Sequence, residues 1–151
     1  LGHTSVDPFG PKCICGNRGC LEVFAKKSVV KEQLHAASDP TERRQILRRA
    51  ADYLAAGIGN LISITGITTI VIGGSMITEF PELFDLLERL IPERSFPAMG
   101  RTMSIRRAAL GLDSSAVGAA LLVGEYGLFN LESALVGNTG SGSPFRTDAV
   151  I

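Results

Sequence analysis

Three cysteines lie close together near the start of the chain, at Cys13, Cys15 and Cys20, and the rest of the 151 residues contain none. An odd number of thiols at such short spacing does not suit a secreted disulfide framework, because the short loops are strained and one thiol is left over. Three closely spaced thiols are more typical of a metal-binding site. Three thiolates need one more ligand for a tetrahedral zinc site, and His3 precedes Cys13 in the same segment. The sequence therefore predicts a zinc site made of His3, Cys13, Cys15 and Cys20.

The segment between these residues is rich in turn-forming residues, which a loop needs to fold around one ion. They are Gly2, Pro8, Gly10, Pro11, Gly16 and Gly19. Two alternatives stay open. The thiols can be reduced side chains of a surface loop, with His3 merely near a chain end, or Cys13 and Cys15 can form a redox pair, although Cys-x-Cys here lacks the strand-to-helix setting of a redox motif.

The composition excludes several classes of protein. Hydrophobic residues make up 45% of the chain and charged residues 20%, which indicates a packed core and excludes wholesale disorder. Fifteen basic residues balance fifteen acidic ones, so this segment is not expected to bind nucleic acid itself. The apolar stretches fall short of the roughly 18 to 20 residues of a membrane span, and no signal peptide is recognisable. The unpaired thiols, together with the lack of a recognisable signal peptide and membrane span, predict a cytoplasmic protein that makes no membrane contact.

Beyond the loop, the pattern alternates between helix and strand. We expect helices over residues 19–37 and 40–64, the second capped by Asp39 and opened by Pro40. The β-branched run over residues 68–72 predicts a buried parallel strand. Lys26, Lys27 and Lys31 are expected to be solvated, and His35 to be exposed.

The second half continues in the same way. We expect a helix over residues 80–91, closed by Pro92, a strand over residues 102–110, and a helix capped by Asp113 or Ser114. Residues 128–151 include a Gly/Ser-rich run that predicts a flexible tail.

Two further features have competing interpretations. A cluster of four arginines at Arg43, Arg44, Arg48 and Arg49 is more typical of a solvated helix face than of a phosphate-binding patch. The pair Gly73-Gly74 ends a predicted strand, where a ligand can approach the backbone of an α/β sheet, but a bare structural turn is as good an interpretation.

Taken together, several motifs resemble the signature of the ROK family, named for repressors, open reading frames and kinases. They are Gly2-His3, Asp7-Pro8-x-Gly10, Cys13-x-Cys15-Gly16-Asn17-x-Gly19-Cys20-Leu21-Glu22, Gly57-Ile58-x-Asn60-Leu61, Ile70-Val71-Ile72-Gly73-Gly74 and Val117-Gly118-Ala119-Ala120. The combination is highly specific and extends over about residues 1–127.

The resemblance implies an α/β fold, namely a ribonuclease-H-like lobe of the actin-like ATPase (hexokinase-type) fold. We expect this carboxyl-terminal lobe to span residues 1–127, with the zinc loop at residues 2–22 and a helix-strand core at residues 23–127. The resemblance also implies a structural zinc ion and a sugar ligand contacted by His3 and Glu22. If the protein is a kinase, Gly73 and Gly74 pass close to the nucleotide. A first-turn glutamate that only stabilises its helix is the alternative for Glu22.

The sequence also departs from the family pattern. The amino-terminal phosphate loop, the catalytic Asn-Asp pair and the family's other sugar-binding glutamate do not occur in it, so we expect the chain alone not to be an enzyme and to be the carboxyl-terminal portion of a longer protein. Self-association is expected to cover its exposed sheet edge.

Three interpretations of the whole protein follow. The first is a sugar-responsive transcriptional regulator that binds DNA through an upstream domain. The second is an ATP- and Mg-dependent sugar kinase, of the glucokinase or N-acetylhexosamine kinase type. The third is a zinc module used only for protein interaction.

Overall fold

The computed structural model describes residues 1–95 and 103–123 and has a mixed α/β architecture, as the sequence predicts. Its elements follow the order α1 (Leu21–Ala25), α2 (Lys27–Ala36), α3 (Pro40–Thr65), β1 (Thr69–Ile72), α4 (Ser75–Glu79), α5 (Pro81–Arg94), β2 (Ser104–Arg107) and a 3-10 turn (Gly111–Asp113). Residues 114–123 are helical. No helix in this described part combines the length and the hydropathy that crossing a bilayer requires.

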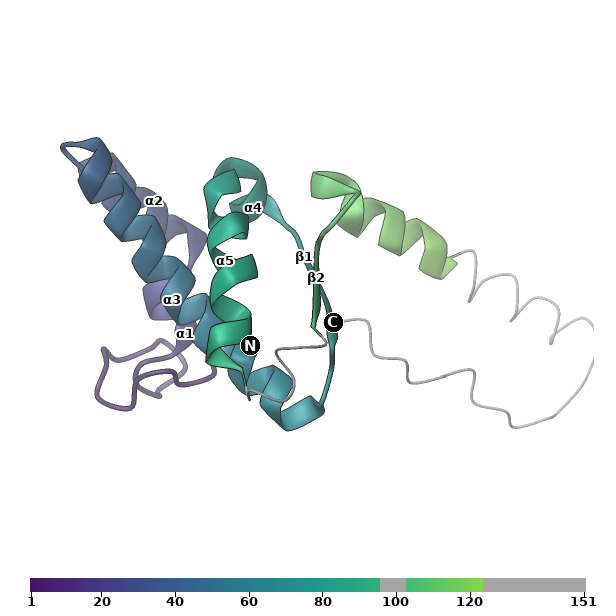
Figure 1. Cartoon of the computed structure of the whole chain (residues 1–151), viewed down its shortest axis with the longest axis horizontal. Helices are drawn as coiled ribbons and strands as arrows, with labels where there is room; N and C mark the ends of the chain where they lie inside the picture. Colours follow the sequence, from purple (N-terminus) through teal and green to yellow (C-terminus); the bar gives the residue numbers. More distant parts are fainter. Residues whose placement is uncertain (96–102, 124–151) are drawn as a thin grey trace, which may run out of the picture.

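The core lies where α5 packs against the long helix α3, and the two strands lie beyond α5 (Figure 1). Helix α2 also packs on α3 and contributes to the same core, and ion pairs join it to α4. Helix α5 places apolar side chains at helical spacing, and Leu83, Leu87 and Ile91 are all at most 1% exposed. They meet the apolar stripe of α3, which includes Leu47 and Ile62. This packing holds the long helix against the rest of the molecule.

The predicted ends of α3 are confirmed. The Asp39 side chain accepts hydrogen bonds from the backbone N–H groups of Thr41 at 2.6 Å and Glu42 at 2.9 Å, which satisfies two of the free donors of the first turn. Hydrogen bonds from Glu42 and then Thr41 lower the pKa of Asp39. At the other end Gly66 adopts φ 73°, and its N–H bonds to the Ile62 carbonyl at 2.8 Å.

The single helix predicted over residues 19–37 is wrong. The helix is interrupted at Lys26, an extended residue with φ −63° and ψ 138° that separates α1 from α2. The break lets each short helix bury its own apolar side. Helix α1 packs on α3, where Phe24 stacks on Tyr53 at 4.0 Å between ring centroids, while α2 buries Val30 and Leu34.

Helix α5 also differs from its prediction. Pro92 lies inside the helix, which continues to Arg94, although a proline removes one backbone hydrogen bond. The burial of Leu90 and Ile91 against the core and a hydrogen bond of 2.7 Å from Ser95 Oγ to the Ile91 carbonyl hold the last turn. The short helix α4 was not predicted.

The two strands form a parallel pair, with Thr69 opposite Ser104 and Ile72 opposite Arg107. The predicted strands are therefore confirmed, in shorter form, and Thr102 lies outside the described residues. The prediction that β1 is buried is wrong. Ile70 and Ile72 pack against the core, but Thr69 and Val71 face away from it, and Val71 is 52% exposed. The reason is that β2 is the only strand beside β1 in the described residues.

The predicted helix after Ser114 is present over residues 114–123, on the far side of the strands from α5 (Figure 1). It leaves large apolar side chains in solvent, among them Leu121 at 66% and Val123 at 73% exposed. The tail predicted over residues 128–151 lies outside the described residues.

Candidate metal centre

The first twenty residues fold back on themselves as a loop that ends at α1. Two isolated antiparallel bridges, Ser5 with Cys20 and Lys12 with Arg18, tie its two arms together. At the tip, the Cys13 N–H donates to the Asn17 carbonyl at 2.8 Å and the Gly16 N–H donates to the Cys13 carbonyl at 3.0 Å. These bonds form a tight turn that brings Cys13 and Cys15 to the same end of the loop.

Asn17 and Arg18 shape the loop through hydrogen bonds. The Asn17 side chain accepts a hydrogen bond from the Arg18 N–H at 2.8 Å, and Arg18 Nη1 donates to the Gly10 carbonyl at 2.9 Å. The Ser5 hydroxyl donates to the Arg18 carbonyl at 2.8 Å. Both residues are committed to the backbone of the loop.

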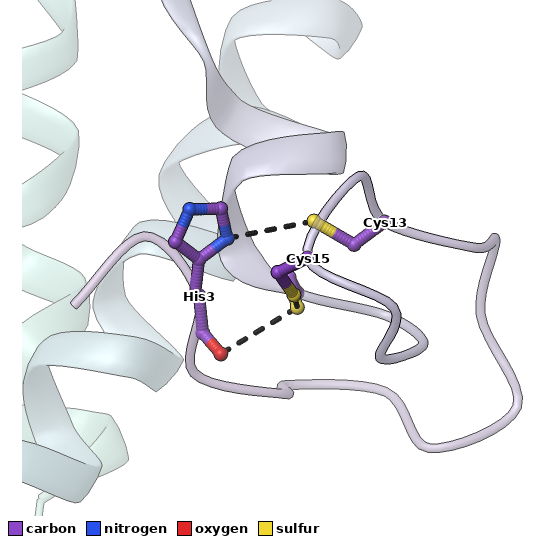
Figure 2. A group of neighbouring side chains, drawn as sticks. His3, Cys13 and Cys15 are labelled. Carbon is purple, nitrogen blue, oxygen red and sulfur yellow. Dashed lines mark hydrogen bonds between the residues drawn. The ribbon is translucent and has the colours of Figure 1, made fainter.

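The four residues predicted as zinc ligands come together. One ligand atom from each of His3, Cys13, Cys15 and Cys20 lies within 4.8 Å of the others. The Cys13 Sγ is 3.5 Å from His3 Nδ1, and the Cys15 Sγ is 3.6 Å from the Cys20 Sγ. Figure 2 shows the His3 ring turned toward Cys13, with Cys15 beside it.

These separations match a tetrahedral zinc site. Bond lengths of ~2.3 Å to sulfur and ~2.0 Å to nitrogen place two sulfurs ~3.8 Å apart, and a sulfur and a nitrogen ~3.5 Å apart. The Cys15 to Cys20 separation of 3.6 Å is far above the ~2.05 Å of a disulfide, and all three cysteines are free. The donor set of three sulfurs and one imidazole nitrogen therefore fits zinc in type, number and spacing.

The protonation of the thiols also matters to metal binding. Burial, with the neighbouring Cys15 and Cys13 side chains, raises the pKa of Cys20 to about 12, and this thiol is 0% exposed. A backbone hydrogen bond from Asn17 lowers the pKa of Cys15. A divalent cation among the sulfurs would offset the cost of burying thiolates, because metal ligation deprotonates a thiol outright.

Glu22 lies against the other side of the His3 ring. Its Oε2 is 3.5 Å from His3 Nε2, the ring nitrogen that does not face Cys13. The Glu22 N–H donates to the Gly2 carbonyl at 2.8 Å, which fixes the start of α1 to the arm of the loop that carries His3. The structure thus brings both predicted sugar-binding residues together with the cysteine cluster.

Beside Glu22 the surface is hollowed. The hollow measures about 390 Å³, and two charged residues, Glu22 and Lys26, line it together with Leu1, Gly2, Leu21, Ala25 and Leu54. A small-molecule site typically has such a volume, with a few polar groups on an apolar wall.

Gly73 and Gly74 lie apart from this hollow, at the carboxyl end of β1. Gly74 adopts φ 99° and precedes α4, and a Cβ on Gly73 would come within 2.5 Å of the Ala108 Cβ. Local structure alone therefore explains both glycines, Gly73 through its close packing and Gly74 through its positive φ. They also line a separate hollow of about 200 Å³ with Thr78 and Arg107.

Three lysines that were predicted to be solvated form ion pairs instead. Lys26 Nζ lies 3.3 Å from Glu22 Oε1, while Lys27 and Lys31 reach Glu79 on α4 at 2.6 Å and 3.0 Å. The spacing of Glu22 and Lys26, four residues apart, is the signal that could have found the first pair. No local sequence pattern indicates the two contacts with Glu79, because α2 and α4 are far apart in the sequence and only the tertiary fold brings them together.

The arginine cluster lies on an exposed face of α3, as the solvated interpretation predicts. Two of its members have acidic partners: Arg48 Nε lies 3.3 Å from Asp52 Oδ2, and Arg43 lies 3.8 Å from Glu82. His35 is exposed, also as expected.

A family model described as "ROK family" matches residues 1–126. Among curated proteins, the xylose repressor of Bacillus spizizenii is 25% identical over 140 residues, which cover 83% of this chain and 36% of the repressor. The N-acetylmannosamine kinase of Haemophilus influenzae strain Rd is 30% identical over 151 residues, covering 91% of this chain and 49% of the kinase. The chain thus spans between a third and a half of the length of these relatives.

Solved structures give the same pair of classes. A ROK hexokinase from Thermus thermophilus matches with a TM-score of 0.63 and 27% identity, over 80% of this chain and 45% of that chain. A ROK family transcriptional regulator, described as a homolog of the Escherichia coli MLC protein, matches with a TM-score of 0.59 and 25% identity, over 71% and 33%.

Proposed function

Because the chain belongs to the ROK family, we propose that it is the zinc-containing, sugar-binding portion of a transcriptional regulator that controls carbohydrate genes. One observation carries the proposal. His3 connects the cysteine cluster to a carboxylate, since its Nδ1 faces Cys13 Sγ and its Nε2 faces Glu22 Oε2, each at 3.5 Å. In this proposal, His3 is the side chain that joins the metal site to the hydroxyl-binding site.

The zinc ion in this proposal is structural and is held by His3, Cys13, Cys15 and Cys20. Four protein ligands leave a tetrahedral ion no open position for a substrate. Zinc instead fixes the His3 ring and the loop that forms one wall of the hollow. The Glu22 carboxylate faces Nε2, the ring nitrogen of His3 that does not bind the metal. It orients the imidazole, as a carboxylate commonly does beside a metal-bound histidine.

Sugar recognition falls to Glu22 and His3. The carboxylate accepts hydrogen bonds from hydroxyl groups, and the His3 ring presents its second nitrogen beside it. Leu21, Ala25 and Leu54 line the hollow beside Glu22, and their apolar side chains suit the C–H faces of a sugar ring. Which sugar binds is set by parts of the protein outside this pair.

At the level of the fold, we propose a ribonuclease-H-like lobe of the actin-like ATPase fold in a cytoplasmic protein. The similarity to the xylose repressor and to the regulator structure supports a regulator, in which an upstream domain binds DNA and bound sugar shifts the protein between two conformations.

A sugar kinase is the second candidate, and the similarity to N-acetylmannosamine kinase over 91% of this chain favours it. In that case ATP and Mg bind away from the hollow beside Glu22, with Gly73 and Gly74 next to the nucleotide. Sugar-dependent consumption of ATP by the protein that carries this sequence indicates the kinase, and sugar-dependent release of DNA indicates the regulator.

We also propose that copies of the chain associate through the free edge of β1. This strand carries no charged side chain, whereas β2 carries Arg106 and Arg107, and charged residues on an edge discourage pairing. A shallow apolar hollow of about 230 Å³ adjoins β1, between it and the end of α3.

The change Glu22→Ala tests the proposed sugar site. We expect it to weaken sugar binding by about 1 to 3 kcal/mol, because the sugar hydroxyls lose a positioned acceptor. Titration calorimetry with glucose, N-acetylglucosamine, N-acetylmannosamine and xylose measures the effect, and zinc content should not change. Glu32→Ala is the matched control, since Glu32 is an exposed glutamate on α2. Equal sugar affinity of Glu22→Ala and the wild type would reduce Glu22 to a first-turn glutamate of α1.

A further inference from the structure

Lys26 occupies an unusual position, as the single extended residue between α1 and α2. Its N–H donates to the Glu22 carbonyl at 3.1 Å, and its own carbonyl accepts from the Val30 N–H at 3.0 Å. The last turn of one helix and the first turn of the next therefore fix its backbone. Its side chain lines the hollow that Glu22 also lines.

The side-chain contacts form a row of three polar groups. Lys26 Nζ lies 3.3 Å from Glu22 Oε1, and His3 Nε2 lies 3.5 Å from Glu22 Oε2. Each carboxylate oxygen of Glu22 thus faces one nitrogen, Oε1 the Lys26 ammonium group and Oε2 the His3 imidazole. The Lys26 side chain is 57% exposed, so its remaining N–H groups are open to solvent and to a ligand.

The next lysine serves a different purpose. Lys27 Nζ and Lys31 Nζ both contact the Glu79 carboxylate, which ties α2 to α4, and Lys27 with Lys31 lowers the pKa of that carboxylate. Lys27 does not line the hollow beside Glu22. The two adjacent lysines thus make different contacts: Lys26 lines the hollow, and Lys27 joins α2 to α4.

We propose that Lys26 is a third ligand-binding residue of this site, and that the ligand it selects is a neutral sugar. The inference rests on the proposed function. A hydroxyl group both donates and accepts, so one hydroxyl can donate to Glu22 and accept from the Lys26 ammonium at the same time. A phosphate or carboxylate suits the site less well, because the ammonium lies within 3.3 Å of a carboxylate that would repel it.

Lys26→Met tests the inference, with Lys27→Met as the matched control. Methionine keeps an unbranched side chain without the charge, so the apolar wall is preserved. We expect Lys26→Met to weaken binding of the neutral sugar by about 10-fold, the worth of one hydrogen bond to a charged group, and Lys27→Met to stay within about 2-fold of the wild type. Lys26→Arg, which keeps a cationic donor, should retain more of the affinity than Lys26→Met. Melting curves and zinc content of the variants establish that each is folded.

The outcomes separate this inference from the proposed function. If the wild type binds none of the four neutral sugars, both fail. If Glu22→Ala weakens binding and Lys26→Met binds as the wild type does, the sugar site stands and the role of Lys26 is wrong. If Lys26→Met weakens binding of a sugar 6-phosphate and leaves that of the neutral sugar unchanged, the assignment of a neutral ligand is overturned.

Discussion

Gly19 lies where the two arms of the loop cross, against the Asp7 carbonyl group. It adopts φ 58°, and a Cβ at this position would lie 1.6 Å from the Asp7 oxygen. Gly16, at the turn between Cys13 and Asn17, also has positive φ, at 92°, but a Cβ there would meet no atom within 4 Å. Of these two glycines, Gly19 alone combines a positive φ with a closed space.

The two glycines therefore predict different effects of one substitution. Gly16→Ala should cost about 1 kcal/mol of folding free energy, the strain of positive φ alone. Gly19→Ala should cost about 3 kcal/mol or more, because the two arms must also move apart. Denaturant unfolding of the zinc-loaded protein measures both, and equal stability of the two variants would show that the arms do not cross as described.

Many individual residues of the site could be predicted from the sequence, because metal ligands occur at a recognisable local spacing. The spacing of the cysteines and one histidine was enough to select the set that the fold brings within 4.8 Å. Glu22 was selected through the family resemblance. The contact of Lys26 with Glu22 was missed, although their spacing of four residues is a signal for it. The break after Ala25 carries no such signal, because no glycine or proline marks it.

Among the elements, helix ends with chemical signals were predictable and those without were not. Asp39, Pro40 and Gly66 located α3 to within a residue. The break at Lys26 and the passage of α5 through Pro92 come from packing against α3, which overrides local preference. Strand β1 was found from its β-branched residues, but its exposure depends on how many strands lie beside it.

The exposure of β1 makes a prediction about association. We expect the chain to self-associate, and we expect Val71→Lys to shift it toward the monomer, because a charge on the open face and edge of β1 opposes strand pairing. Sedimentation velocity measures the change. Val123→Lys is the control, since Val123 is also an exposed valine, 73% accessible on the helix over residues 114–123. Dissociation by Val123→Lys and not by Val71→Lys would place the interface on that helix instead.

For the molecule as a whole, the α/β class and membership of the ROK family were predictable, and the one-sided exposure of the sheet was not. The reason is one of scale. Periodicity and motifs report on segments of a few residues to a few turns, whereas the burial of a strand depends on elements from anywhere in the assembly. The arrangement of residues 1–25 around the candidate metal centre is the part on which the proposed function depends most.

The zinc content of the purified protein tests the central claim most directly. Elemental analysis should find one zinc ion per chain in the wild type and in His35→Ala, and much less in His3→Ala and Cys20→Ala, because His35 is an exposed residue of α2 while the other two are ligands of the proposed site. A strong chelator should lower the melting temperature of the wild type. A wild-type protein that contains no zinc and melts at the same temperature with and without chelator would contradict the account.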